Sequence, residues 1–111
     1  MNCFIELWNP TEAWKSLSKE ERQEYLGQIG PHLQGLMEQG VEIISWGKNN
    51  KDTSHRAGFD YFAVWKFPSN EMAKEFENVV ESAGWYNYFE QVNLSGESTT
   101  PDVIIGELIA I

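Results

Sequence analysis

The stretch Ala57–Phe67, which reads AGFDYFAVWKF, carries the strongest β-strand pattern in the chain. Aromatic and β-branched residues fill it, and no proline interrupts it before Pro68. One side of this strand holds Phe59, Tyr61, Ala63, Trp65 and Phe67, and the other holds Phe62 and Val64 with Asp60 and Lys66. A strand that is apolar on both faces requires cover on both. In so short a chain helices can cover only one face, so we expect a second copy of the protein on the other.

Capping and turn residues divide the rest of the chain. Ser18 and Glu21 form a capping-box pattern, and apolar residues then recur at helical spacing as far as Gly40. Pro31 lacks a backbone donor and should kink or split this helix near its middle. The other expected elements are a strand at 2–8, a helical turn at 11–17, a strand at 41–47, a hairpin loop at 48–55, a helix at 69–83, a strand at 85–94, a polar linker at 95–100, and a C-terminal helix at 101–110 for which a strand is the alternative.

Composition excludes several classes of protein. The 111 residues favour a single domain, 1–111, and the net charge of −9 argues against nucleic acid or an anionic membrane surface as partner. Cys3 is the only cysteine, so the sequence contains neither a disulfide framework nor CxxC metal-binding spacing. No apolar run approaches the roughly 18 residues of a membrane span. We therefore expect a cytoplasmic protein that binds no metal and contacts no membrane.

The order strand, helix, strand, strand, helix, strand is the ferredoxin-like βαββαβ arrangement, an α+β fold with a four-stranded antiparallel sheet and helices on one face. With this order, the length and the two-faced central strand, the chain resembles the dimeric α+β barrel superfamily, and most of all its small members without assigned chemistry. The resemblance implies that two sheets pack face to face in a homodimer. It also implies a ligand between the helices and the sheet. No catalytic set of that superfamily transfers to this chain residue by residue.

His32 is the candidate catalytic residue. Its spacing from Tyr25 and Ile29 places it on the helix face that meets the sheet. An imidazole there can act as a general base with a pKa close to neutral. The alternative is a core histidine held by one hydrogen bond. Because the two histidines lie far apart in sequence, we predict no metal site and no cofactor, with haem ligation through His32 or His55 as a remaining alternative.

Aromatic and polar residues from several segments are candidates for ligand binding. His55 and Arg56 precede the central strand and could hold a carboxylate at a pocket mouth, although a solvated loop is the alternative. The tyrosines and tryptophans could line a cavity, or serve only as core and dimer interface. The full set of candidates is Tyr25, Ile29, His55, Arg56, Trp46, Tyr61, Trp65, Trp85, Tyr86 and Tyr88.

Two function hypotheses follow. The first is a small-molecule-binding protein, or a cofactor-free monooxygenase-like enzyme, whose ligand is an apolar aromatic compound or a long-chain aliphatic acid. The second is a non-catalytic dimeric protein for stress response or ligand sequestration. The sequence leaves open whether the protein is an enzyme. Both hypotheses include a dimer through one sheet face, for which the candidates are Phe4, Trp8, Ile44, Trp46, Phe62 and Val64.

Overall fold

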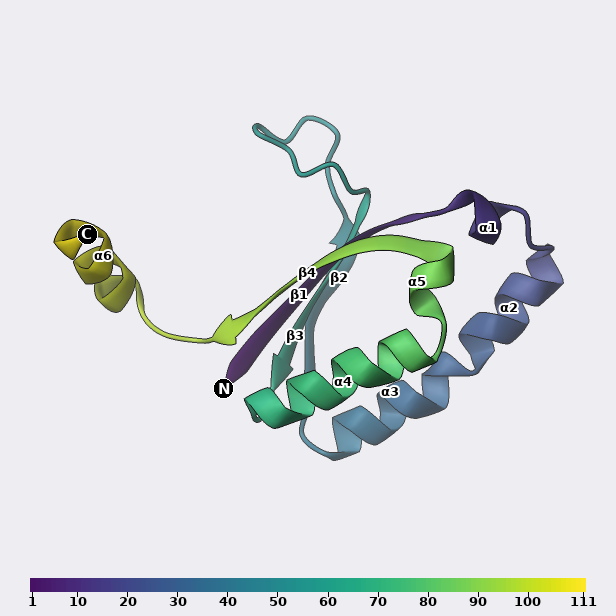
Figure 1. Ribbon diagram of the computed structural model, residues 1–111, viewed down its shortest axis with the longest axis horizontal. Helices are drawn as coiled ribbons and strands as arrows, with labels where there is room; N and C mark the ends of the chain where they lie inside the picture. Colours follow the sequence, from purple (N-terminus) through teal and green to yellow (C-terminus); the bar gives the residue numbers. More distant parts are fainter.

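The computed structural model describes all residues from Met1 to Ile111 and contains one four-stranded sheet (Figure 1). Its strands are β1 (Asn2–Pro10), β2 (Glu42–Lys48), β3 (Tyr61–Phe67) and β4 (Phe89–Glu97). They lie in the order β2-β3-β1-β4, and each neighbouring pair is antiparallel. The expected α+β class and the four-stranded antiparallel sheet are therefore confirmed.

Six helices connect or extend these strands: α1 (Glu12–Lys15), α2 (Lys19–Gly27), α3 (Ile29–Glu38), α4 (Asn70–Ser82), α5 (Trp85–Tyr88) and α6 (Pro101–Ala110). The capping box predicted at Ser18 is present in both directions, with Ser18 Oγ accepting from the backbone of Glu21 and Glu21 Oε1 accepting from the backbone of Ser18. Ser69 caps α4 in one direction only, with its hydroxyl oxygen accepting from the backbone N–H of Met72.

The predicted break near Pro31 is confirmed. The helical segment divides at Gln28 into α2 and α3, and Pro31 is the third residue of α3. The backbone donors of a first helical turn have no acceptor within the helix, so proline removes nothing there. Gly40 ends the segment with a φ of 97°, as expected for a left-handed C-terminal residue.

The core lies between one face of the sheet and helices α3 and α4 (Figure 1). Strand β1 alternates strictly between buried and partly exposed residues from Asn2 to Trp8. Ala73 and Phe76 of α4 pack against this buried face, and Leu33 and Leu36 of α3 contact the same cluster. The buried apolar residues are Phe4, Trp8, Val41, Ala63, Trp65, Phe67, Ala73, Phe76 and Phe89.

The second face of the sheet carries no helix and holds a different set of apolar side chains. Our grouping of six residues on one sheet face is wrong, because Phe4 and Trp8 belong to the core whereas Phe62 and Val64 alternate away from it. Trp46 also contacts Trp8 and Trp65 on the core side. We call the second side the open face, and its apolar residues are Cys3, Ile5, Leu7, Phe62, Val64, Val92 and Leu94.

Two predicted strand boundaries are also wrong. Trp85–Tyr88 forms the helical turn α5, and the fourth strand starts at Phe89 and extends past Leu94 into the expected linker, where it ends at Glu97. Gly84, with a φ of 75°, turns the chain into α5, where the N–H of Asn87 donates to the Gly84 carbonyl. The Tyr88 carbonyl then accepts from the backbone and the hydroxyl of Thr11, both at 2.9 Å. These contacts stabilise a helical turn in a segment whose aromatic residues, taken alone, favour a strand.

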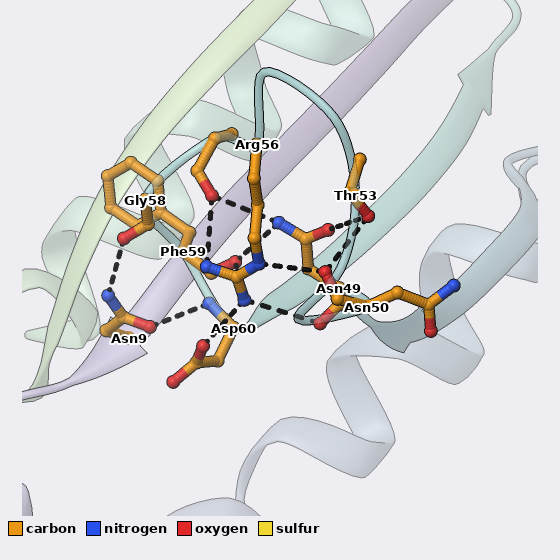
Figure 2. A network of polar contacts seen from close by, with 9 residues as sticks. Asn9, Asn49, Asn50, Thr53, Arg56, Gly58, Phe59 and Asp60 are labelled. Carbon is orange, nitrogen blue, oxygen red and sulfur yellow. Dashed lines mark hydrogen bonds and ion pairs between the residues drawn. The ribbon is translucent and has the colours of Figure 1, made fainter.

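The central strand begins at Tyr61 rather than at Ala57, because the preceding residues belong to a long loop organised by Arg56 (Figure 2). The Arg56 guanidinium donates to the carbonyl oxygens of Asn49, Asn50, Ala57 and Phe59 and forms an ion pair of 2.8 Å with Asp60. Asn9 closes the base of the loop: it donates to the Gly58 carbonyl and accepts from the Asp60 N–H.

Helix α6 confirms the C-terminal helix predicted at 101–110 and excludes the strand alternative, and it lies apart from the other helices beyond the end of β4 (Figure 1). All of its residues are exposed, including Ile105, Leu108 and Ile109. None of the helices combines the length and apolar character needed to cross a membrane.

Candidate functional site

A cavity of about 350 Å³ lies between α3, α4 and the core face of the sheet. Most of its wall is hydrophobic, and polar groups enter at only a few positions. The apolar lining residues are Ile29, Leu33, Leu36, Trp46, Trp65, Phe76, Val79, Val80, Ala83 and Trp85. Residues along the length of α3, from Ile29 to Leu36, form one part of the wall, and residues of α4 from Glu75 to Val80 form another.

Glu6 brings a buried carboxyl group to the cavity from the middle of β1. Glu6 is only 5% exposed, because it lies on the core face of β1 between Phe4 and Trp8, which are both core residues. Trp65 Nε1 donates to Glu6 Oε1 over 2.7 Å, and Gln91 Nε2 donates to Glu6 Oε2 over 2.7 Å. Each carboxyl oxygen therefore has one donor from a neighbouring strand.

Two opposing effects act on the pKa of Glu6, and burial is the larger. Burial raises the pKa of this carboxyl group above its usual value, whereas the hydrogen bonds from Trp65 and Gln91 partly offset the rise. No lysine, arginine or histidine forms an ion pair with Glu6. The carboxyl group is thus held by neutral donors alone, which is an uncommon arrangement for a buried acid.

A chain of hydrogen bonds extends from Glu6 to the protein surface. Trp85 Nε1 donates to Gln91 Oε1 over 2.7 Å, which orients the Gln91 amide so that its NH₂ group faces Glu6. The same NH₂ group donates to Asn93 Oδ1, and Asn93 in turn donates to the hydroxyl oxygen of Tyr86. This series fixes the carboxyl group in place and joins the cavity wall to the exposed side chains of Asn93 in β4 and Tyr86 in α5.

Five of the predicted site residues line the cavity. Ile29 and the tryptophans Trp46, Trp65 and Trp85 contribute to its apolar wall. His32 lines it from α3 with an exposed side chain, so it is not a core histidine. The structure brings these residues together, and their roles in binding or catalysis remain predictions.

The four predicted tyrosines lie outside the cavity lining. Tyr25 and Tyr88 pack with Trp14 in a separate aromatic cluster, where burial, followed by the proximity of Tyr88, raises the pKa of Tyr25. The hydroxyl of Tyr25 donates to the Ala83 carbonyl over 2.8 Å. Tyr61 stacks on Trp8, and Tyr86 ends the hydrogen-bond series described above.

His55 and Arg56 belong to the loop shown in Figure 2 and do not line the cavity. Arg56 donates its hydrogen bonds to carbonyl oxygens of that loop and to Asp60. The hydrogen bond from Arg56 is the main cause of the lowered pKa of Asp60. His55 is exposed and has a φ of 54°, a conformation that non-glycine residues adopt rarely. The structure therefore gives both residues a place in the loop and none in the cavity wall.

Glu6 is the residue that we did not single out from the sequence. The signal was present, since a lone carboxylate alternates with Phe4 and Trp8 on the face that became the core. A charged residue between two large aromatic residues on one strand face marks either an edge or a buried polar group, and only the pairing of β1 between β3 and β4 distinguishes these cases.

No group of three histidine, cysteine, aspartate or glutamate side chains is arranged so that it could hold a metal ion. Comparison with known protein families gives one match over residues 1–111, to a family described as "Family of unknown function (DUF6616)". No curated protein matches the chain.

Proposed function

The chain belongs to this family of unknown function, and we propose from the geometry of its cavity that it binds a small, mainly apolar molecule between α3, α4 and the sheet. The observation that carries the proposal is the coincidence of an apolar cavity with one buried, hydrogen-bonded carboxyl group in its wall. Ligand sites in proteins characteristically combine a hydrophobic lining with a few fixed polar groups.

Cavity size supports this proposal. A volume of about 350 Å³ lies near the lower end of the range of roughly 300–1,000 Å³ for small-molecule pockets. It suits a single aromatic ring with a short aliphatic chain. Three tryptophans in the wall supply large, rigid contact surfaces, and the two indole N–H groups of Trp65 and Trp85 are already used in holding Glu6 and Gln91.

Assembly is the second part of the proposal. We propose a ferredoxin-like fold that forms a homodimer through the open face, in a dimeric α+β barrel, and acts in the cytoplasm. The strand order β2-β3-β1-β4 supports the fold, and the apolar residues of the open face support the dimer. In a single protomer Val92 is 49% exposed and Leu94 is 59% exposed. Together with the neighbouring Ile5 and Val64 they would form a continuous apolar surface in contact with water.

Cofactor-free, monooxygenase-like chemistry is a second candidate function. One observation favours it: His32 and Glu6, two ionisable groups, line the same apolar cavity and could take a proton from a bound phenol. Oxygen uptake by the metal-free protein with an activated phenol tests it. An unchanged rate in His32→Ala would remove His32 as the base, and the absence of uptake leaves sequestration as the function.

Filling the cavity tests the binding proposal directly. Gly35 of α3 lines the cavity, and a Cβ atom placed there meets nothing within 4 Å, so Gly35→Leu should fold and occupy the space. Gly27→Leu in α2 is the matched control, because Gly27 is equally unobstructed but lies outside the lining.

Three probes with one hydrocarbon body serve as ligands: 4-phenylbutan-1-amine, 4-phenylbutan-1-ol and 4-phenylbutanoate. Saturable quenching of tryptophan fluorescence by at least one of them is expected in the wild type and in Gly27→Leu. The Gly35→Leu variant should lose it while keeping its circular dichroism spectrum. If none of the three probes binds, or if Gly35→Leu binds them as well as the wild type does, the binding proposal is wrong.

A further inference from the structure

We infer that the cavity selects a cationic ligand, an amine with one ammonium group attached to a compact hydrophobic body. The inference rests on the proposed binding function and specifies the chemical class of the ligand. It departs from the long-chain aliphatic acid, one of the two ligand classes in the first function hypothesis. Three features of the cavity wall lead to it: the charges of its residues, the acceptor positions of Glu6 that no protein donor occupies, and the indole rings.

The first feature is the set of charges around the cavity. Its lining contains two carboxyl groups, Glu6 from β1 and Glu75 from α4, and one titratable base, His32 from α3. No lysine or arginine belongs to the lining. An anionic ligand would therefore meet like charges and no strong counter-charge, whereas an ammonium group would meet a buried carboxylate that has no cationic partner in the protein.

The second feature is the remaining hydrogen-bond capacity of Glu6. An ionised carboxylate offers about four acceptor positions, and the protein fills two of them, one on each oxygen. Both partners are donors and neither is charged. An ammonium group, which carries only donors, complements the open positions, whereas a ligand carboxylate supplies no donor at neutral pH.

The third feature is the aromatic wall. Trp46, Trp65 and Trp85 all line the cavity, and the face of an indole ring is the best aromatic partner for a cation. The wider field acts in the same direction, because the net charge of −9 attracts cations and repels anions. The same wall would accept a neutral aromatic ligand, so the charge of the head group is the feature to test.

The three probes already described differ only in that head group, and calorimetric titration at pH 7.5 ranks them. We expect 4-phenylbutan-1-amine to bind at least about tenfold more tightly than 4-phenylbutan-1-ol, and 4-phenylbutanoate to bind most weakly. Equal affinity of amine and alcohol would overturn the inference while leaving the binding proposal standing. Preferential binding of 4-phenylbutanoate would also overturn it and restore the acid ligand.

Glu6→Gln locates the selectivity. It keeps the side-chain volume and removes the charge, so the advantage of the amine over the alcohol should disappear. Glu90→Gln is the matched control, because Glu90 is an exposed carboxylate of β4 next to Gln91 and does not line the cavity. A wild-type preference that survives Glu6→Gln and is lost in Glu75→Gln would overturn the assignment to Glu6. If Glu6→Gln fails to fold, the order of the three probes on the wild type still decides.

Discussion

Trp65 Nε1 and Glu6 Oε1 lie 2.7 Å apart in a buried hydrogen bond that joins residues 59 positions apart in the chain. The bond crosses from β3 to the adjacent β1 on the core face, so its geometry is set by the pairing of the two central strands. It places an acidic group against an indole in the cavity wall, and the proposed ligand site depends on that placement.

Trp65→Phe should lower the free energy of unfolding by about 1–3 kcal/mol, because it leaves a buried acceptor without its donor. Chemical denaturation followed by circular dichroism measures the difference. Trp46→Phe makes the same change of side chain in the cavity wall at an indole without a hydrogen bond. Because Trp46 is 47% exposed and Trp65 only 1%, the double-mutant cycle of Trp65→Phe with Glu6→Gln separates the hydrogen bond from the lost packing. Equal stability of Trp65→Phe and Trp46→Phe would show that the Trp65–Glu6 bond contributes nothing.

Stability should depend on pH through Glu6. Burial raises the pKa of Glu6 in the folded protein above its value in the unfolded chain, so the folded state binds more protons between these two pKa values. The contribution of Glu6 to stability is therefore fully present below the unfolded pKa and is lost as pH rises through the folded pKa.

The difference in unfolding free energy between the wild type and Glu6→Gln isolates this effect from the other carboxylates. We expect the wild type to gain stability relative to Glu6→Gln as pH falls from 7 toward 4.5, the unperturbed value of the group. His32 and Glu75 line the same cavity, and His32→Ala and Glu75→Gln serve as controls that should leave this trend unchanged. A constant difference across the range would contradict a raised pKa.

Arg56→Lys should loosen the loop at 49–60 without weakening the binding of cavity ligands. A lysine cannot reproduce the contacts of the guanidinium with several carbonyl oxygens and Asp60. We therefore expect the free energy of unfolding to fall by about 1–3 kcal/mol and proteolysis in the loop to become faster. Lys51→Ala in the same loop is the control. Reduced affinity for the probes would instead bring Arg56 back as a ligand-binding residue.

Leu94→Glu should convert the proposed homodimer into a monomer. Leu94 lies on the open face opposite Ile5, and a charge placed there would be buried without a partner in a face-to-face dimer. Sedimentation velocity at micromolar concentration measures the change. Leu26→Glu introduces the same charge on α2, at an exposed position away from the sheet, and should leave the assembly intact. A wild type that sediments as a monomer would remove the dimer from the proposal.

Local patterns predicted much of the fold. Capping residues located α2 and α4, alternation located β1 and β3, and Pro31 marked the break in the first helical segment. The patterns failed where contacts distant in sequence decide the conformation. Trp85–Tyr88 is aromatic enough for a strand, yet the hydrogen bonds from Thr11 and the turn at Gly84 make it helical.

The site was less accessible from the sequence than the fold. The spacing of His32 and Ile29 placed both on a helix face that the structure brings to the cavity. Tyr86 and Tyr88 could not be placed correctly, because their position depended on the misassigned strand. Predicting that Glu6 is buried requires knowing which face of β1 becomes the core. Predicting the role of Arg56 requires the full path of the loop, because the carbonyl oxygens that it contacts come together only in the folded chain.

Helix α6 has a consequence for handling the protein. None of its residues is buried, so α6 adds no packing to residues 1–97. Its side chains Ile105, Leu108 and Ile109 expose an apolar surface to water. A tail of this kind favours self-association at high concentration unless another surface shields it. A chain that ends at Ser98 should therefore have a higher solubility than the full chain and the same Tm.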